Sequence, residues 1–565
     1  MKWCDQCYFT MSDIHWERIF LEFSITAAPN GPRDVKFYLV TPESSKKEVC
    51  PPGDGNPSWV PIAYDAKTRL SDNRISFRFS INMAAVTHRS FLENGDWRFC
   101  GVSDAYIYPV AISPGDAYNA DLWSRIFKYG KNQYAYNVSF SVREISKTHI
   151  ELILHSYFMH INKKWKKRKY VQEAVTFKGK LKRMYLWLVI MMIRCFYFVF
   201  SRLLPKNGDR VLFMTETKDY LWGNLKYIHD RMLERGLDSR FKICCSCRKS
   251  VGNKSSALSW IKTVFRVAAS DFVFIDDYAP VFGFFKLYKK TRLIQVWHAG
   301  EGFKSVGYSR FGKDGSPFPM GSCHKAYTFA LTGAKNLIKV YEEVFGIEKE
   351  AFLPTGMARL DHFLDPDHIC QVKAGFYKQW PSLEGKKIIL FAPTFRGTGQ
   401  KDAWYDYSRL DLKEIYDFCG RDTVFLVKMH PFVRKSIPIP DRYRDRIMDF
   451  SSYPDINELF YITDLLVTDY SSNFYEFSLL KRPILFYTYD REFYELTRGV
   501  HRSVAKYAPG KVCDTFQELM TALKTQDYEF DKTCRFVREN FGTYDGHASD
   551  RIINQILLNE GETSE

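Results

Sequence analysis

The stretch that decides the fold is Val467–Asp490, which reads VTDYSSNFYEFSLLKRPILFYTYD. It continues the apolar run Ile462–Val467, which has the length and composition of a buried parallel strand. A polar turn with Asp469, Ser471 and Ser472 follows, then a short helical pattern and a second apolar run, ILFY. We expect the hydroxyl side chains to cap that helix and its first N–H groups to favour an anion. Taken alone, the pattern fits an ordinary helix cap equally well.

The same alternation of apolar runs and helical patterns begins near Arg210 and continues through the rest of the chain. It predicts two consecutive doubly wound α/β halves, residues 205–370 and 371–565, whose facing edges form the default ligand site. The predicted strands are Val211–Met214, Phe241–Cys244, Phe272–Ile275, Leu293–Val296, Lys325–Phe329 and Ala351–Leu353 in the first half, and Lys387–Phe391, Val424–Lys428, Leu465–Thr468 and Pro483–Tyr487 in the second.

Residues 1–162 have a different character and are expected to form a small β-rich accessory domain, a sandwich or a barrel. Partial alternation of apolar and polar residues between Pro, Gly, Asn and Asp turns predicts strands there. These strands are expected at Trp16–Thr26, Val35–Thr41, Arg74–Asn82 and Asn137–Val142. No catalytic constellation is visible in this region.

Residues 163–204 join a basic run, KKWKKRK at 163–169, to the apolar stretch Met184–Leu204. That stretch is just long enough to span a bilayer, but Arg194 lies in its middle. Arg183, Arg194, Ser201 and Arg202 fall within a sector of about 100° on a helical projection. We therefore expect an amphipathic helix at an anionic membrane surface. A true span and a buried interdomain helix are the alternatives.

The composition indicates a globular, reduced, strongly basic protein. With 565 residues the chain is too long for a single hydrophobic core. Its 81 basic and 65 acidic residues give a net charge of +16. Such an excess suits nucleic acid, an anionic membrane or a polyanionic substrate. The 13 cysteines include one CxxC at Cys4 and Cys7 without a second pair, so no zinc site is expected. The N-terminus lacks the pattern of a secretory signal, so we expect the protein in the cytosol or on its membrane.

Polar residues follow the predicted strands of both halves. His298 enters a Gly-rich turn, WHAGEGFK, after one strand; Lys428 and His430 follow another, and Arg396 lies in APTFRG after a third. With the Ser471 turn, they offer the point charges, guanidinium fork and backbone donors that a pyrophosphate needs. Glu476, seven residues after Asp469, could accept hydrogen bonds from ribose hydroxyls, although its spacing fits a solvated helix face equally well.

Two nucleotide-binding signatures are absent. The sequence has no GxxxxGK[ST], and no GxGxxG follows a strand, which disfavours kinase, NTPase and dinucleotide functions. Asp276 and Asp277 form a plain doublet, from which no metal site is expected.

The series WHAGEGFK, TGMARLD, APTFRG, KMHP and TDYSSNFYEFSLLKRPILFYTYD, closed by YDGHASDR at 544–551, resembles the CDP-glycerol glycerophosphotransferase family of teichoic acid polymerases and primases. The resemblance covers about residues 205–560. It implies a GT-B fold and the transfer of glycerol phosphate or ribitol phosphate from CDP-glycerol or CDP-ribitol to a hydroxyl of a lipid-linked polymer, with release of CMP. It also implies a peripheral bacterial enzyme on the cytoplasmic face of the membrane.

The resemblance also assigns residues. His298 and His430 correspond to histidines implicated in catalysis, and we expect His298 to be the general base and His430 a pyrophosphate ligand or acid. The donor phosphates are expected near Ser471 and Ser472 and its ribose near Glu476. Asp469, Arg396 and Lys428 are further donor-side residues, the last two assigned from their charge. The other candidates are Gly300, Lys304, Arg359 and Thr394. Phe395 and Glu476 stand where the family often has Trp and Asp.

Other functions remain open at this point. A nucleotide-sugar glycosyltransferase of the same fold and a non-enzymatic envelope scaffold are the alternatives, and no standard nucleic-acid motif is present. The sequence separates neither glycerol from ribitol donors, nor primase from polymerase, nor wall teichoic acid from capsule.

Overall fold

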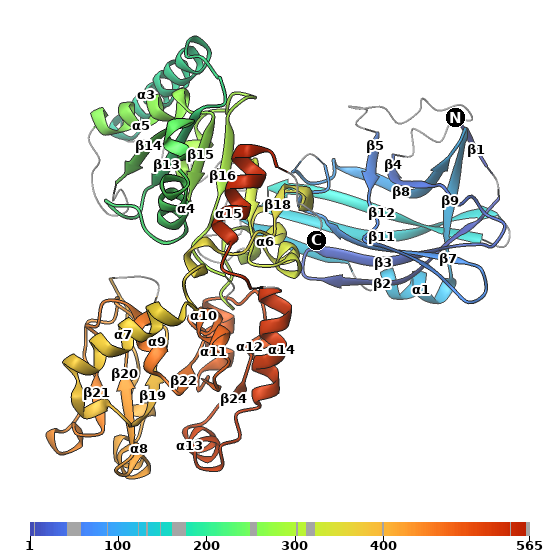
Figure 1. The fold of residues 1–565 in the computed structure, drawn as a ribbon. Helices are drawn as coiled ribbons and strands as arrows, with labels where there is room; N and C mark the ends of the chain where they lie inside the picture. Colours follow the sequence, from blue (N-terminus) through green and yellow to red (C-terminus); the bar gives the residue numbers. More distant parts are fainter. Residues whose placement is uncertain are drawn as a thin grey trace. The chain divides into compact units, whose positions relative to one another are not determined.

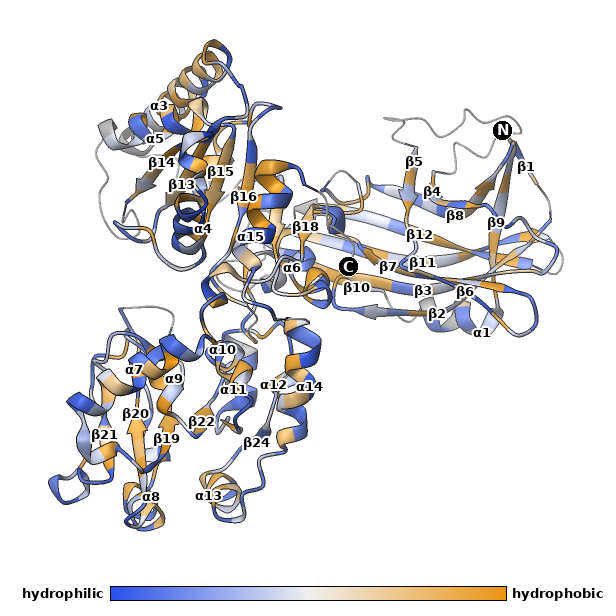
Figure 2. Cartoon of the chain, in the orientation of Figure 1, coloured by the Kyte–Doolittle hydropathy of each residue, from blue (hydrophilic) through white to orange (hydrophobic). Residues whose placement is uncertain are grey.

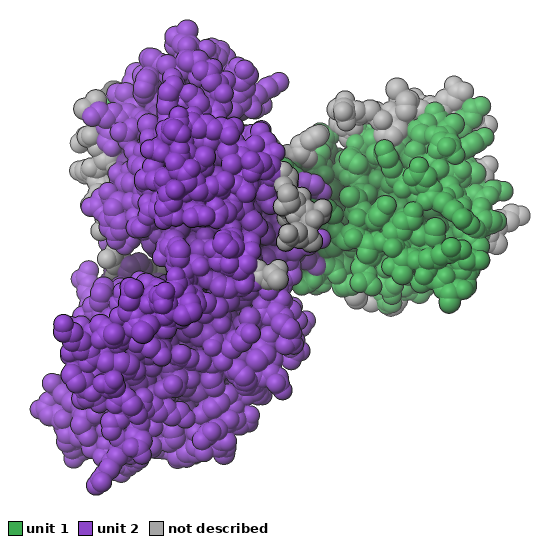
Figure 3. All heavy atoms as spheres, viewed as in Figure 1, with its two compact units in different colours: residues 1–185, 307–325, 341–349 green, residues 186–306, 326–340, 350–565 purple. Residues whose placement is uncertain are grey.

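The computed structural model describes residues 1–4, 6–41, 58–87, 89–121, 124–130, 134–146, 149–160, 177–248, 257–300, 303–311, 323–397, 401–542 and 544–560. The chain forms two compact units (Figure 3). Unit 1 comprises residues 1–185, 307–325 and 341–349, and unit 2 comprises residues 186–306, 326–340 and 350–565. The basic run at 163–169 lies outside the described residues.

Unit 1 is built on a twelve-stranded, mostly antiparallel sheet (Figure 1). The sheet curls so that distant strands pack face to face, and the rings of Phe23 and Phe99 lie 5.3 Å apart. The single strand expected at Trp16–Thr26 is instead a hairpin, because Arg18 turns the chain at a φ of +56°. The elements are β1 Lys2–Trp3, β2 Phe9–Glu17, β3 Phe20–Ala27, β4 Lys36–Val40, β5 Trp59–Ile62, β6 Ala66–Arg69, β7 Ile75–Asn82, β8 Gly95–Ser103, β9 Tyr106–Ile112, α1 Pro114–Asp121, β10 Arg125–Tyr129, β11 Tyr134–Ser146 and β12 His149–His160.

The first half of unit 2 contains a six-stranded parallel sheet in the order β14-β13-β15-β16-β17-β18. Its strands β13, β15 and β16 are apolar and buried between helices, as their sequences predict (Figure 2). The edge strand β14, expected at Phe241–Cys244, begins at Lys242 and is largely exposed. The strand expected at Lys325–Phe329 begins only at Phe329, because Cys323–Ala326 forms a 3₁₀ turn. The elements are β13 Arg210–Thr215, α4 Gly223–Glu234, β14 Lys242–Cys247, α5 Ala257–Ala269, β15 Phe272–Ile275, β16 Arg292–Gln295, β17 Phe329–Leu331 and β18 Phe352–Leu353. Helix α6 (Ile338–Phe345) begins in unit 2, and its residues 341–345 belong to unit 1.

The second half of unit 2 repeats this plan in the order β21-β20-β19-β22-β23-β24. Strands β21 and β24 were not predicted, since three residues carry no periodicity. The expected cap of α10 is wrong: the helix starts after Asn473, and its N-cap makes no side-chain hydrogen bond. The elements are α7 Pro366–Gln379, β19 Lys387–Phe391, α8 Leu412–Cys419, β20 Thr423–Val427, β21 Ile447–Asp449, α9 Ile456–Ile462, β22 Leu465–Thr468, α10 Phe474–Leu479, β23 Ile484–Tyr487, α11 Arg491–Thr497, α12 Val504–Tyr507, β24 Lys511–Cys513 and α13 Phe516–Thr525.

The end of the described chain returns to the first half. After α14 (Phe530–Phe541), helix α15 (Ala548–Ile553) continues into a π-helical turn, Asn554–Leu558. Ile552, Ile553, Ile556 and Leu557 join the same hydrophobic core as Val211, Phe213 and Leu225 of the first sheet and α4. Residues 548–558 therefore complete the first half, although the sequence places them after the second.

Helix α3 (Phe177–Leu203) presents its apolar side chains outward. Tyr197 and Ser201 are buried, the Tyr197 ring stacks on Phe285 at 4.1 Å, and the Arg194 Nε donates to the Phe284 carbonyl at 2.6 Å. The side chains exposed by 43–72% are Met184, Tyr185, Trp187, Leu188, Met191, Met192, Phe198, Val199 and Leu203. Part of the expected polar stripe thus faces the protein. No helix within the described ranges is long and apolar enough to cross a bilayer.

Candidate functional site

Asp469, directly after β22, organises the second half of the site. Its side chain is completely buried. Oδ1 accepts the Thr394 N–H at 2.8 Å and the Ser471 N–H at 3.3 Å, while Oδ2 pairs with Arg396 Nη1 at 2.7 Å. One carboxylate therefore fixes the loops that follow β19 and β22, including the turn that carries the exposed Ser472.

Arg396 is turned inward. Its Nε and Nη2 donate to Asp490 at 2.6 and 2.9 Å, and Nη1 serves Asp469 and the Thr394 carbonyl. The side chain is 5% exposed and lies 5.1–5.3 Å from the ring centroids of Tyr405, Tyr470, Tyr489 and Tyr494. A guanidinium held this way orders the Asp469 turn. The expectation that Arg396 stabilises the donor phosphates stays a prediction, and its contacts with Asp469 and Asp490 hold the turn.

His430 is a neutral hydrogen-bond donor. Its Nδ1 accepts the Phe432 N–H at 3.2 Å, which leaves the proton of the neutral ring on Nε2. Burial, together with the charges of Lys304 and Lys428, lowers the pKa of His430 to about 4. Lys428 is itself buried, and its Nζ donates to the Ser451 carbonyl at 2.8 Å. Burial also lowers the pKa of Lys428.

His298 has the opposite arrangement. Its Nδ1 lies 3.1 Å from the Asp276 carbonyl oxygen, an acceptor, so Nδ1 carries the proton and Nε2 offers its lone pair. The ring is exposed at the end of β16. A histidine whose Nδ1–H is held by a backbone carbonyl, so that Nε2 carries the lone pair, has the geometry of a general base.

A strained residue places His298. Trp297 has a φ of +51°, which a bulky side chain rarely adopts. The Asn224 side chain donates to the Trp297 carbonyl at 2.8 Å, and the Gln295 side chain accepts the Trp297 N–H at 2.9 Å. The sequence analysis did not identify Asn224 and Gln295 as residues that hold the backbone of Trp297. The one signal in the sequence was an asparagine in the first turn of a helix, directly after Gly223.

Lys304 and its neighbours connect the first half of unit 2 to the second half. Its Nζ donates to Thr394 Oγ1 at 2.6 Å. The Phe303 carbonyl accepts the His501 N–H at 2.6 Å, and the Ser305 N–H donates to the Gly499 carbonyl at 3.1 Å. Burial lowers the pKa of Lys304 to about 8. The WHAGEGFK and APTFRG motifs, far apart in sequence, therefore meet at this ammonium group.

Glu476 and Arg359 also join the halves. Arg359 Nη2 forms an ion pair with Glu476 Oε1, and both side chains are largely buried. The neighbouring Tyr475 ring fits between Gly300 and Gly333: a Cβ added to either glycine would lie 2.0 or 2.2 Å from Tyr475 atoms. Gly300 is thus required for close packing against Tyr475.

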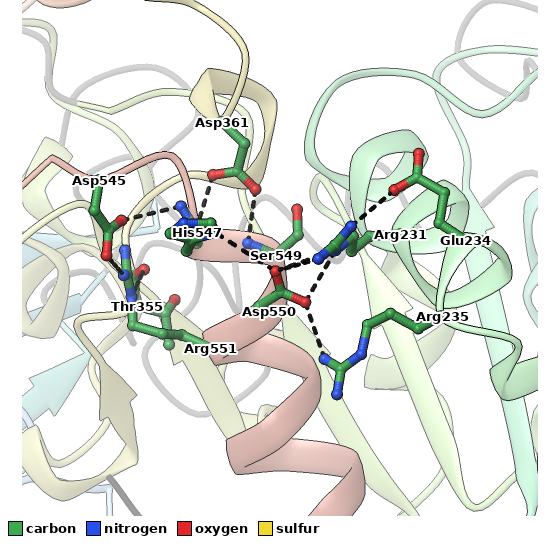
Figure 4. A network of polar contacts seen from close by, with 11 residues as sticks. Arg231, Glu234, Arg235, Thr355, Asp361, Asp545, His547, Ser549, Asp550 and Arg551 are labelled. Carbon is green, nitrogen blue, oxygen red and sulfur yellow. Dashed lines mark hydrogen bonds and ion pairs between the residues drawn. The ribbon is translucent and has the colours of Figure 1, made fainter. Parts of the chain in front are cut away.

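The TGMARLD and YDGHASDR motifs form the connection between α15 and the first half (Figure 4). Asp361 accepts the backbone N–H groups of Ala548 and Ser549 at 2.9 and 2.8 Å. Asp550 pairs with Arg231 at 2.9 Å and Arg235 at 3.0 Å. These motifs serve the architecture of unit 2 and lie beside a cavity of about 280 Å³.

The described part of the chain holds no group of three or more His, Cys, Asp or Glu side chains placed to bind a metal ion. Asp276 is buried, with its pKa raised to about 6 by that burial.

A family model described as CDP-glycerol:poly(glycerophosphate) glycerophosphotransferase matches residues 196–558. The chain belongs to this glycerophosphotransferase family. The resemblance seen in the sequence is thereby confirmed, and the matched residues contain every site residue discussed above.

The similar proteins act on teichoic acids. The chain is 35% identical over 353 residues to the Staphylococcus aureus teichoic acid ribitol-phosphate polymerase TarL, covering 62% of this chain and 63% of that one. It is 36% identical over 369 residues to the Bacillus spizizenii teichoic acid poly(ribitol-phosphate) polymerase, covering 65% and 59%. The chain therefore spans less than two thirds of the length of these two relatives.

A solved structure supports the fold. The wall teichoic acid polymerase TagF superposes with a TM-score of 0.51 at 20% identity, covering 68% of this chain and 98% of that chain. At this level of identity the match speaks for the GT-B type of α/β fold alone.

Proposed function

We propose that this protein transfers a polyol phosphate from a CDP-activated donor to a hydroxyl of a polyol-phosphate acceptor and releases CMP. The observation that carries the proposal is the pair of histidines with opposite roles. His298 offers an Nε2 lone pair, and His430 offers an Nε2–H. The two lie at the carboxyl ends of strands in different halves, which is where a GT-B enzyme binds its two substrates.

The chemistry follows from these roles. The acceptor hydroxyl gives its proton to His298 Nε2 and attacks the β-phosphorus of the donor, and the bond from that phosphorus to the bridging oxygen breaks, so that CMP leaves. His430 Nε2–H donates to a phosphate oxygen and Lys304 neutralises charge that develops on the leaving group. Phosphoryl transfer needs little more from a protein than positioning and charge stabilisation.

The remaining donor contacts come from the second half. We assign the phosphates to the Ser471 and Ser472 turn, which Asp469 and Arg396 hold in place, with Lys428 nearby. Glu476 would accept hydrogen bonds from the ribose hydroxyls, beside its ion pair with Arg359. A TagF structure, with a TM-score of 0.52 to this chain, was obtained after a 15 minute soak with CDPG.

We propose CDP-ribitol as the donor. The polymerases of Staphylococcus aureus and Bacillus spizizenii that match at 34–36% identity carry ribitol-phosphate names, whereas a Bacillus spizizenii poly(glycerol phosphate) polymerase matches at 33% over 214 residues. The longer alignments with the ribitol enzymes support this choice.

CMP release tests the proposal. Wild-type protein should release CMP from CDP-ribitol only when a polyol-phosphate acceptor is present, and His298→Ala should lower the rate by about 100-fold to 10,000-fold. His149→Gln, an exposed histidine of unit 1, is the matched control and should behave as wild type. Release from CDP-glycerol alone would correct the donor. Release from neither donor would refute the proposal and turn attention to nucleotide-sugars.

We also propose that α3 binds a membrane surface peripherally. Its exposed apolar surface continues onto α5, where Ile261 and Phe265 are 51% and 40% exposed. The ring centroids of Phe265 and Phe200 lie 5.4 Å apart. Such a face beside basic residues suits an anionic leaflet.

Vesicle binding tests this surface. Trp187→Glu combined with Met192→Glu should release the protein from vesicles of anionic phospholipid, while Tyr220→Glu, an equally exposed aromatic residue outside α3, should not. Unchanged sedimentation of the double variant would refute the assignment. Charge reversal at Lys163, Lys164, Lys166 and Lys167 tests the electrostatic contribution separately.

A further inference from the structure

An arginine of the first half has a buried N–H group that the proposed reaction does not use. Arg248 directly follows β14, and its backbone N–H donates to the Thr215 carbonyl at 3.1 Å. Its side chain is 11% exposed, yet Nη1 has no hydrogen-bond partner within the described ranges. A buried donor without a partner is costly, so such groups in native structures call for an explanation.

The Arg248 guanidinium is held in a fixed orientation. Nε donates to Glu216 Oε1 at 3.0 Å, and Nη2 pairs with the same oxygen. The guanidinium carbon lies 3.9 Å from the centre of the Trp260 ring. One edge and one face are thus occupied, and Nη1 is left buried and without a hydrogen-bond partner among the described residues. An arginine ordered in this way is well suited to a phosphate group.

Arg248 lies at the same carboxyl edge of the sheet as His298, the proposed general base. The sheet order β14-β13-β15-β16 places Arg248, Asp276 and His298 after the first, third and fourth of these strands. With strands about 4.8 Å apart, the end of β14 before Arg248 lies about 14 Å from the end of β16 before His298 along the carboxyl edge. Between them, the buried Asp276 Oδ2 also has no hydrogen-bond partner among the described residues.

We infer that this edge binds the acceptor chain, with Arg248 on a phosphodiester and Asp276 Oδ2 on a polyol hydroxyl, so that the terminal hydroxyl lies at His298. The inference rests on the proposed function and extends it to the acceptor. A chain that alternates phosphates with polyols alternates groups that accept hydrogen bonds with hydroxyl groups that donate them. This edge offers the matching groups in the same order, a guanidinium donor at Arg248 and a carboxylate acceptor at Asp276. The enzyme then selects acceptors that already contain a phosphodiester, and a bare polyol is a poor substitute.

Acceptor kinetics test the inference. We expect Arg248→Met to raise the KM for a soluble oligo(ribitol phosphate) by about tenfold to a hundredfold, the effect of losing one charged hydrogen bond. The KM for CDP-ribitol and the rate with free ribitol as acceptor should not change. Arg248→Lys should show an intermediate KM, because it keeps the charge but loses the planar fork.

Two controls separate binding from folding. Arg266→Gln removes an exposed arginine of α5 that donates to the Cys245 carbonyl at 2.8 Å, and its acceptor KM should match wild type. The double variant Glu216→Gln with Arg248→Met avoids leaving a buried carboxylate without its partner. It should retain the wild-type Tm and still show the raised KM.

The outcomes are distinct from those of the proposed function. Calorimetric binding of oligo(ribitol phosphate), measured without donor, should weaken in the double variant even if no CDP-polyol is turned over. Equal affinity of wild type and double variant would overturn the inference while leaving the transferase intact. Competition by inorganic phosphate at the same concentration as the oligomer would identify a simple anion site and would also overturn it.

Discussion

Replacing Gly300 by alanine should destabilise unit 2, because the new methyl group would overlap the ring of Tyr475. The added Cβ would lie 2.0 Å from Tyr475 Cε1, where ordinary contact begins at 3.4 Å. Tyr475 is completely buried, its ring lies 4.3 Å from that of Phe541, and its hydroxyl donates to the Asn540 carbonyl at 3.2 Å. Moving the ring into the neighbouring cavity of about 280 Å³, which Tyr475 lines, would break both of these contacts.

Overpacking of this kind costs about 1–3 kcal/mol. For a domain of 150–250 residues, each kcal/mol lowers Tm by about 2–4 °C, which circular dichroism resolves easily. Gly375→Ala is the matched control. It lies inside α7 with nothing within 4 Å of the added Cβ and should gain about 0.4–1 kcal/mol from the loss of backbone freedom in the unfolded chain.

We expect strong coupling between Gly300 and Tyr475. Tyr475→Ala removes the ring and should itself cost about 3–5 kcal/mol. In that background Gly300→Ala should cost nothing further, because its methyl group enters the vacated space. An equal loss of Tm in both backgrounds, or no loss in the wild-type background, would refute the proposed overlap.

Three other results are expected. Arg396→Met should cost about 3–5 kcal/mol, since Asp469 and Asp490 would lose their buried partner; a Tm within 1 °C of wild type would contradict this. The Lys304 ammonium, whose pKa of about 8 lies below the usual range, is charged below pH 8 and neutral above it, so kcat/KM for the donor should fall as pH rises through 8. Lys304→Arg should move that fall to higher pH, whereas a wild-type profile that is flat up to pH 9.5 would exclude the role. Glu476→Gln should raise the donor KM by about tenfold and abolish discrimination against a 2′-deoxyribose donor; retained discrimination would assign the ribose to another residue.

The sequence was most informative where chemistry and strand ends coincide. Buried parallel strands are recognisable as continuous apolar runs, and β15, β19 and β22 have the predicted bounds. Since parallel strands end at one edge, the polar residues after them could be predicted to gather there. His298, Lys428, His430 and the Ser471 turn are found at such strand ends.

The roles that the sequence could not reveal depend on contacts between residues far apart in the chain. A charge in a motif does not reveal whether it faces a ligand or the protein, and Arg396 is directed inward by Asp490, 94 residues away. Asn224 acts on Trp297 from 73 positions earlier, and only their contact reveals its role. The start of α10 was misplaced because Asn473 and not a serine precedes the helix, and its amide instead donates to the Ala392 carbonyl.

The return of residues 548–558 to the first half has a consequence for synthesis. The ribosome releases the strands of the first sheet early, but the core around Val211 and Phe213 lacks Ile552, Ile553 and Ile556 until the whole second half has been translated. Domains usually fold in the order in which they emerge. Here the second half can reach its native state first, because the first half cannot complete its core until α15 has been synthesised. Until then the apolar surface of the first half stays uncovered and accessible to chaperones.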